Sequence, residues 1–267
     1  MDPSINEVDP RRQVNWPGMD VVEELIWLSR RLGEPSLGLA ILAEGNASAN
    51  DGDEFLIKGS GFQLATLGQD QLSRIDRASA AKYLTGPELS DSETREALNK
   101  LSPKLAPSVE TFMHAELLGI PAVQFVAHCH PTALLSLLCT SEVEQFAAQR
   151  LFPDEVVCCG PASVFIPYTD PGLPLAREVK TGVEKYVGQF GEAPKTIWLE
   201  NHGLITLGST AAEAFGGTLM SEKAAKIRLH ALASGLPIKP LSKIEIDRIH
   251  TRPDEHYRQQ LLRQLTK

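Results

Sequence analysis

Apolar residues follow two kinds of spacing along this chain, and each spacing predicts a different kind of element. Between Asp20 and Leu32 they recur at every third or fourth position, which is typical of an amphipathic helix that Gly33 ends. The same spacing predicts helices at 111–118, 132–139, 173–190 and 211–234. Short apolar runs predict strands at 39–42, 54–57, 122–127, 196–199 and 204–207, with one or two more within 156–167.

The order of these elements predicts the fold class. Strands and helices alternate without an internal repeat, which indicates one α/β domain with terminal extensions. Residues 50–53 and 201–203 have the composition of hairpin turns, so the sheet is expected to be at least partly antiparallel. We divide the chain into an irregular N-terminal arm, a main domain and a partly helical C-terminal extension, at 1–17, 18–238 and 239–267.

Composition narrows the classes of partner. The 267 residues carry 26 basic and 34 acidic side chains, with a formal net charge of −8. There is no basic stripe, so neither nucleic acid nor an anionic membrane is an expected partner, although a local pocket can still bind an anionic small molecule. No apolar run approaches the length of a membrane span. The four cysteines lack metal or disulfide spacing, which favours a reducing, cytoplasmic location.

Two histidines lie two residues apart where a predicted strand ends. The run 122–127 leads into His128 and His130, and side chains at i and i+2 of a strand point to the same side, with Cys129 facing the other way. Such a pair is half of a first-row metal site, or simply two histidines that each hydrogen-bond a neighbour. His202, in a turn where Gly203 permits close backbone approach, offers a third imidazole. Three neutral imidazoles are typical of a catalytic metal site, which would act as a Lewis acid.

Glu110 has two interpretations. With Ser108 as the N-cap, Glu110 falls at the second position after the cap, in the first turn of its helix. As a structural residue it would complement the helix dipole, which contributes at most about 1 kcal/mol. As a catalytic residue it would be the general base beside a metal-bound carbonyl. His114 lies one turn further on the same face, and we expect it to be a buried supporting residue rather than a ligand.

Several polar residues could hold an anion such as a phosphate. Ser60 and Gly61 form a loop after a strand, where backbone amides can surround a phosphate or a carboxylate. Ser108 at a helix start adds a hydroxyl group, and Asn46 adds a side-chain donor. Lys58 is the positive charge nearby. Taken singly, each of these is more often a turn or a cap than a ligand, and the loop lacks the longer spacing of a P-loop.

Taken together, five separate blocks resemble the motifs of the class II aldolase/adducin family. They follow the family's order along 45–206: GNAS (45–48), IKGSG (57–61), PSVETFMH (107–114), VAHCHP (126–131) and ENHGLIT (200–206). The interval of 14 from Asn46 to Ser60 also equals that in the fuculose-phosphate aldolase type. The resemblance implies a three-layer αβα sandwich around a nine-stranded, mainly antiparallel sheet. It also implies active sites between the subunits of a fourfold homotetramer.

The resemblance also implies a role for each matching residue. His128, His130 and His202 would be the ligands of Zn²⁺ or another divalent first-row metal. Glu110 would be the acid/base that also touches the metal in the resting state. The substrate phosphate would be held by Asn46, Ser60, Gly61 and Ser108.

Two positions depart from the family pattern. Val109 stands where the family's sugar-phosphate aldolases often have a second serine. No tyrosine matches the proton donor that the fuculose-phosphate type contributes from a neighbouring subunit, and the first tyrosine after 152–155 is Tyr168. The KGSG block, HPTALL and IPYTDPG are closer to the aldolase domain of rhamnulose-phosphate aldolase/dehydrogenase fusions.

These observations predict a metal-dependent lyase. It would cleave a ketose 1-phosphate, such as fuculose- or rhamnulose-phosphate, to dihydroxyacetone phosphate and an aldehyde. The same fold and metal site could instead serve epimerisation, dehydration or decarboxylation of a sugar phosphate. A third alternative is a non-catalytic, adducin-like scaffold, which is disfavoured because adducin-type members lack the three metal histidines that this chain has.

Overall fold

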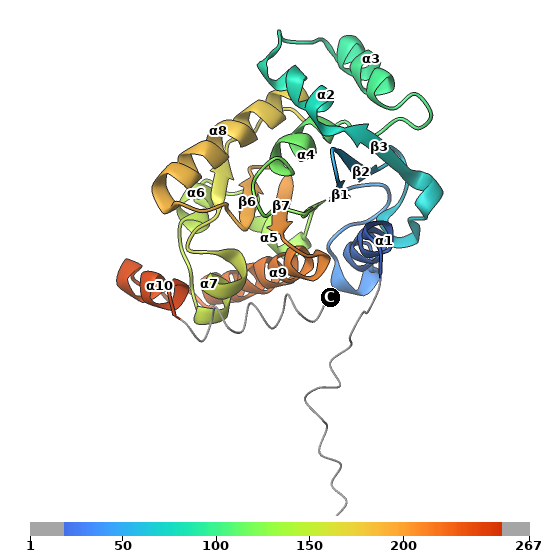
Figure 1. Cartoon of the computed structure of the whole chain (residues 1–267). Coiled ribbons are helices and arrows are strands. Elements are labelled where there is room, and N and C mark those ends of the chain that lie inside the picture. The colour runs from blue at the N-terminus through green and yellow to red at the C-terminus, as the bar shows by residue number, and fades with distance from the viewer. Residues whose placement is uncertain (1–18, 253–267) are drawn as a thin grey trace, which may run out of the picture.

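A central sheet carries the structure in the computed structural model, which describes residues 19–252 (Figure 1). Its strands are β1 (Asn46–Asp51), β2 (Glu54–Lys58), β3 (Leu72–Asp76), β4 (Phe125–Cys129), β5 (Val164–Ile166), β6 (Thr196–Leu199) and β7 (Gly203–Gly208). Their order is β3-β2-β1-β4-β7-β6-β5, and every neighbouring pair is antiparallel except β5 and β6. The mainly antiparallel sheet is confirmed, with seven strands in the described part of the chain rather than nine.

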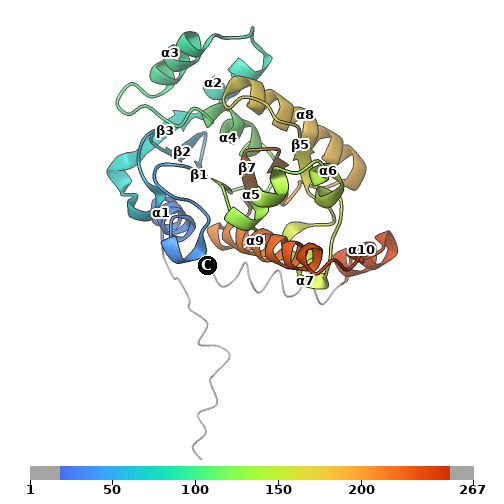
Figure 2. The same cartoon turned by 180° about the vertical axis from the view of Figure 1, so that it is seen from behind.

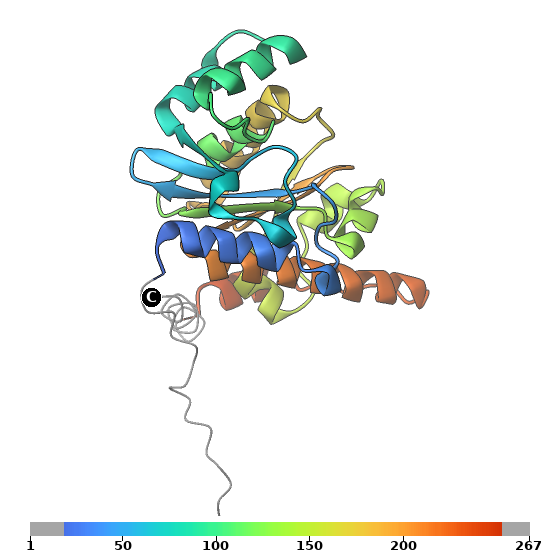
Figure 3. The same ribbon diagram turned by 90° about the vertical axis from the view of Figure 1, so that its right-hand side faces the viewer.

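Helices cover both faces of this sheet (Figure 3). The helices are α1 (Val21–Leu32), α2 (Arg77–Ala81), α3 (Asp91–Leu101), α4 (Thr111–Leu117), α5 (Thr132–Leu138), α6 (Val143–Ala147), α7 (Pro153–Cys159), α8 (Leu173–Phe190), α9 (Ala211–Ala233) and α10 (Lys243–His250). Figures 1 and 2 show α9 along the base of the molecule, with α1 near one end and α7 and α10 near the other. The expected αβα sandwich is therefore confirmed. The arm 1–17 lies outside the described residues.

Successive side chains of each strand point to opposite faces of the sheet, so a separate hydrophobic core forms on each face. In β2, Phe55 and Ile57 join the core beneath α4 and α8, whereas Leu56 points to the core formed with α1 and α9. In β4, Val126 lies on the first side and Cys129 on the second. Because His128 occupies the alternate position to Cys129, it faces the α4 side of the sheet, as the sequence pattern predicts.

Two expectations about local structure are wrong. Residues 39–42 do not form a strand, because Leu42 has φ 51° and the flanking Gly38 and Gly45 also have positive φ, which an extended chain cannot contain. The expectation of one or two strands within 156–167 is borne out by β5, while residues 156–159 belong to helix α7, which Pro153 begins from a position that favours helix starts. The N-cap of α4 is Glu110 rather than Ser108. Strands β1 and β3 were not predicted.

The C-terminal part of the described chain packs against the body of the molecule. Ile246 and Ile249 of α10 are buried against Val156 and Val157 of α7. Helix α10 lies within the extension that begins at 239, and residues 253–267 of that extension lie outside the described residues. Among the described helices, none combines the length and the apolar character that crossing a bilayer requires.

Glu222 of α9 holds the beginning of α5, the helix that follows His130. Its buried carboxylate accepts hydrogen bonds from the backbone N–H groups of Ala133 and Leu134, each at 3.1 Å. Helix α5 has no side-chain cap of its own, so Glu222 supplies from another helix the acceptor that a cap would give. Lys226 pairs with the same carboxylate at 3.2 Å.

We expect Glu222→Ala to lower the free energy of unfolding by about 2–4 kcal/mol, because two buried N–H groups lose their acceptor. Urea denaturation measures this loss. Glu178→Ala, which removes a carboxylate from the surface of α8, is the control and should change stability by no more than about 0.5 kcal/mol. A loss below about 1 kcal/mol for Glu222→Ala would contradict this assignment.

Candidate active site

Three histidines from two separate segments meet at one end of the sheet. His128 and His130 lie at the end of β4, and His202 lies in the turn between β6 and β7. One ring nitrogen from each histidine lies within 4.8 Å of those of the other two, and this is the metal-capable cluster found among the described residues. The structure therefore brings together the three histidines that the sequence singles out.

The close approach of two strands makes this meeting possible. A Cβ atom at Gly203 would lie 2.6 Å from Cδ2 of His130 and 2.7 Å from the carbonyl oxygen of Cys129. Asn201 has φ 52°, which asparagine tolerates better than most residues, and it turns the chain so that His202 points toward β4. The role expected for Gly203 is confirmed, because a larger residue would push the histidines apart.

Hydrogen bonds fix which nitrogen of two rings carries the proton. Nδ1 of His128 lies 3.0 Å from the carbonyl oxygen of Leu204, and Nδ1 of His130 lies 3.1 Å from Oε2 of Glu44. Both partners can only accept, so both Nδ1 atoms donate and both Nε2 atoms present lone pairs. These Nε2 atoms face each other at 3.2 Å. Two lone pairs at this distance repel each other, and a cation between them removes the repulsion.

Burial keeps the histidines in the form that binds metals. Desolvation, together with the smaller effect of neighbouring histidines, lowers the pKa of His128 to about 3 and that of His202 to about 4. At neutral pH these rings are therefore uncharged, and a neutral imidazole is the form that binds a metal ion.

Glu110 supplies a carboxylate beside these rings. Its Oε2 lies 3.3 Å from Nε2 of His128, and its Oε1 lies 3.3 Å from Nε2 of His202. Although Glu110 is the N-cap residue of α4, its side chain makes no capping hydrogen bond. Oε1 is buried without a hydrogen-bond partner. A buried, unpaired carboxylate oxygen beside three imidazoles fits a divalent cation, so these residues suit the metal that the sequence predicts.

A chain of buried hydrogen bonds supports Glu110 from behind. Asn46 donates from Nδ2 to Oε2 of Glu110 at 2.7 Å, and its Oδ1 accepts a hydrogen bond from Nε2 of His114. Because that nitrogen must carry the proton, Nδ1 of His114 accepts from the hydroxyl group of Ser48 at 2.6 Å. His114 is therefore a buried supporting residue, as expected, and Ser48 is a member of the site that the sequence did not single out.

Two loops bring the expected phosphate-binding residues together. Ser108 accepts a hydrogen bond from Nδ2 of Asn46 at 3.1 Å. The amide of Ser60 donates to the carbonyl oxygen of Ala106 at 2.9 Å, which joins the loop at 59–61 to the segment before Ser108. That amide is therefore already paired, and Ser60 has its side chain rather than its N–H to offer a ligand. Gly61 has φ 81° and is exposed.

Lys58 is not the free cation expected beside this loop. It is buried, and its Nζ donates to the carbonyl oxygens of Phe62, Ala43 and Gly59 at 2.8, 3.3 and 3.4 Å. Burial lowers the pKa of Lys58 below its usual value, and the nearby negative charge of Glu110 offsets only part of this effect. The side chain therefore ties the segment before Asn46 to the loop at 59–62 instead of facing a substrate.

Two departures from the family pattern lie near the site but outside its buried part. Val109 is 44% exposed. Tyr168 is also exposed, and its hydroxyl group donates to Asp170 at 3.0 Å. The Tyr168 amide donates to Glu200, two residues before His202.

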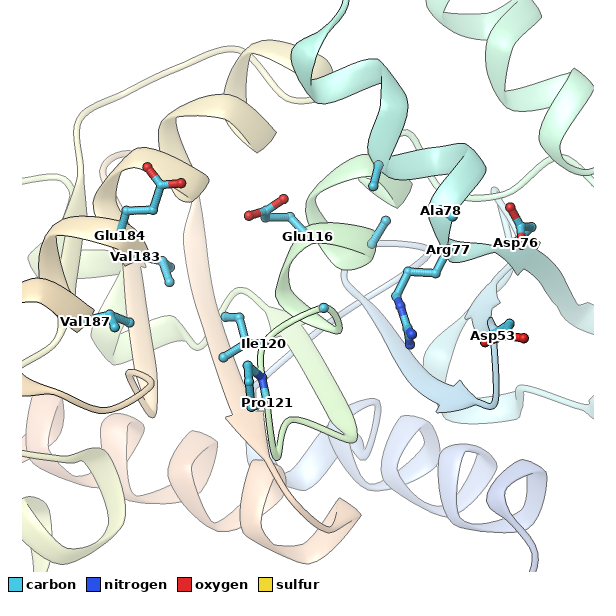
Figure 4. A pocket seen from close by; sticks show the side chains of 13 residues that line it. Asp53, Asp76, Arg77, Ala78, Glu116, Ile120, Pro121, Val183, Glu184 and Val187 are labelled. Atoms are coloured by element: carbon cyan, nitrogen blue, oxygen red, sulfur yellow. The ribbon is translucent and has the colours of Figure 1, made fainter.

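Of two cavities in the described part of the chain, one adjoins the proposed phosphate loops and the other lies away from the site. One, of about 490 Å³, adjoins the phosphate loops, with Ser60, Val109, Arg95 and Asp170 in its lining. The other, of about 840 Å³, lies between α2, α4 and α8, where Asp53 and Glu116 line it (Figure 4). Asp53 follows the far end of β1, roughly 17 Å along the strand from Asn46, so the larger cavity is not part of the histidine site.

The αβα fold is that of class II aldolase-like proteins, and three histidines that could hold a metal ion lie at one end of its sheet. The chain belongs to the family described as Class II Aldolase and Adducin N-terminal domain, whose model matches residues 23–229. A relative, the uncharacterized oxidoreductase YuxG of Bacillus subtilis (strain 168), is 25% identical over 238 residues. The match covers 82% of this chain and 32% of YuxG, so this chain spans about a third of that protein's length.

Solved structures share the fold. The N-terminal class II aldolase domain of a conserved protein from Thermoplasma acidophilum is 27% identical, with a TM-score of 0.65, over 81% of this chain and 99% of that chain. The L-fuculose-1-phosphate aldolase of Thermus thermophilus is 21% identical, with a TM-score of 0.58, over 81% of this chain and 98% of that chain.

The buried histidines predict a loss of stability in acid. His114 has its pKa lowered to about 3, chiefly by desolvation, against an ordinary value of 6.5. Above pH 6.5 the His114 ring is neutral in both the folded and the unfolded protein. Between 6.5 and 3 only the unfolded chain takes up the proton, so stability falls by up to about 1.4 kcal/mol per pH unit for this residue.

Urea denaturation of the metal-free protein between pH 7 and pH 5 measures this dependence. We expect His114→Gln to reduce the pH slope of the unfolding free energy by about one proton. His230→Gln, which changes an exposed histidine on α9, serves as the control and should leave the slope unchanged. An unchanged slope in His114→Gln would show that this imidazole is protonated in the folded protein.

Proposed function

We propose that this protein is a metal-dependent lyase that cleaves a ketose 1-phosphate to dihydroxyacetone phosphate and an aldehyde. The observation that supports it most is the unpaired Oε1 of Glu110, 3.3 Å from Nε2 of His202 and buried beside three imidazoles. This places a proton-accepting group next to a site that suits a divalent metal. A Lewis acid on the carbonyl and a group that transfers the proton together can catalyse cleavage of a carbon–carbon bond next to that carbonyl.

In this proposal, metal binding and proton transfer are carried out by different residues of the chain. His128, His130 and His202 hold the metal, which when bound supplies Lewis acidity for the substrate carbonyl. As the bond from carbon 3 to carbon 4 breaks, the hydroxyl group on carbon 4 gives its proton to Glu110 and becomes the aldehyde oxygen; Glu110 then gives this proton to carbon 3, and the reverse reaction runs the two transfers backwards. The hydrogen bond from Asn46 keeps Oε2 of Glu110 in place, so Oε1 is the atom that carries the proton.

The substrate phosphate has its proposed place at the two loops. Ser60 and Gly61 face solvent beside the segment that carries Ser108, and Asn46 reaches Ser108. Because Lys58 is occupied by three carbonyl groups, the phosphate would be held by hydroxyl, amide and backbone donors rather than by this lysine.

We also propose a homotetramer in solution. Ile41 and Leu42, next to the loop of Asn46, are 64% and 78% exposed, and an interface between subunits would cover such side chains. Light scattering measures the assembly state. A stable monomer at micromolar concentration would contradict the proposal.

The alternative functions that the same site could serve are distinguished by their products. Epimerisation or dehydration would use the same metal and Glu110 but release no aldehyde, and decarboxylation would release carbon dioxide. An adducin-like scaffold would turn over no sugar phosphate and bind no metal. Incubation of the purified, zinc-loaded protein with a panel of ketose and pentose phosphates separates these cases when the product is identified, because aldehyde release marks the aldolase, an altered sugar or carbon dioxide marks the other enzymes, and no product marks the scaffold.

Glu110→Gln tests the catalytic assignment. If Glu110 is the acid/base, this near-isosteric change should lower turnover by about 10²–10⁴-fold while leaving the fold unchanged. Zinc content should fall only in part, because the three histidines remain. The measurement is turnover and metal content beside the wild type, with His128→Ala as the variant in which zinc binding itself should fail.

Two results would overturn the assignment. Undiminished turnover in Glu110→Gln at full metal occupancy would mean that another residue transfers the proton. Less than about a tenth of an equivalent of metal in the zinc-loaded wild type would remove the metal site itself.

A further inference from the structure

We propose that Glu44 is a positioning residue of the metal site, which orients His130 so that its Nε2 points at the metal. Because Glu44 would act through a metal ligand, this role rests on the proposed function. Glu44 Oε2 lies 3.1 Å from Nδ1 of His130. A carboxylate only accepts, so the proton sits on Nδ1 and the lone pair of Nε2 is directed toward Nε2 of His128, 3.2 Å away.

The Glu44 carboxylate is itself held in place. Its other oxygen, Oε1, accepts from the amide of Ile41 at 2.7 Å, and the Glu44 amide donates to the carbonyl oxygen of Ile41 at 3.2 Å. The segment is fastened to β4 on both sides of this loop. The amide of His130 donates to Leu39, and a Cβ atom at Gly45 would lie 2.8 Å from the carbonyl oxygen of His128.

His130 depends on such a contact more than His128 does. The His128 side chain is 1% exposed and its Nδ1 donates to a strand carbonyl, so packing and β7 hold it. The His130 side chain is 19% exposed, so packing encloses it less completely than it encloses His128. A carboxylate on the second nitrogen of a metal-binding histidine fixes both the tautomer and the ring direction.

An amide in place of the carboxylate distinguishes this role from simple loop closure. Glutamine has one acceptor oxygen, whereas Glu44 uses two, one for Ile41 and one for His130. If the oxygen stays with Ile41, the loop is preserved and the NH₂ group faces Nδ1 of His130. That nitrogen must then accept, which moves the ring proton to Nε2, the atom that must be free for the metal.

The test measures metal affinity directly, with no need for a substrate. The full-length protein is stripped with a chelator, and Zn²⁺ binding is measured by competition with a chromogenic chelator. We expect Glu44→Gln to bind Zn²⁺ about 10–100-fold more weakly than the wild type, and Glu44→Asp to recover part of the affinity. Glu116→Gln is the matched control, since Glu116 is also a part-buried carboxylate, paired with Lys180 at 2.7 Å, and should bind as the wild type does.

Nitrogen NMR of the histidine rings gives a second readout that does not depend on any variant folding. In the metal-free wild type His130 should be protonated at Nδ1. A proton on Nε2, or an unchanged Zn²⁺ affinity in a folded Glu44→Gln, would overturn the role of Glu44 while leaving the proposed function standing. Failure of the wild type to bind Zn²⁺ would instead overturn the metal site and the proposed function together.

Discussion

The register of β4 between β1 and β7 is the constraint on which the whole site depends. It sets His128 opposite Asn46 on one side and opposite Ile205 on the other. Because side chains alternate along a strand, a slip of one residue would turn His128 into the core beneath α1 and α9 and bring Cys129 out in its place. Gly203 allows β7 to approach β4 closely in this register, since no larger residue fits against His130.

This register creates an electrostatic arrangement that is unfavourable without a cation. The Nε2 atoms of His128 and His130 face each other, and the unpaired Oε1 of Glu110 lies beside them in a buried position. Protonation could relieve the repulsion between the rings, but burial makes a charged imidazole costly, as the lowered pKa of His128 shows. A divalent ion would satisfy all of these groups at once, so the fold is complementary to a charge that its own residues do not supply.

The sequence alone predicts the members of the site better than the contacts between them. The histidine pair and the Asn-His-Gly turn follow from local periodicity and turn chemistry, and the structure brings both to one place. In the sequence Lys58 is the positive charge near the loop, yet its Nζ is occupied by the carbonyl groups of Gly59 and Phe62 and by that of Ala43, 15 residues away, which only the fold brings to the other two. Glu44 carries no local signal, since its partner His130 lies 86 residues away in the chain.

Asn46 links the proposed phosphate site to Glu110, the proposed acid/base. Its NH₂ group has two hydrogens, and both are in use, one to Ser108 and one to Glu110. A substrate phosphate held by Asn46 must therefore replace one of these contacts. Because His114 fixes the amide from behind, Asn46 cannot simply rotate to offer more donors. In the proposed function, phosphate binding and the placement of the proton-transferring carboxylate are thus coupled through a single side-chain amide.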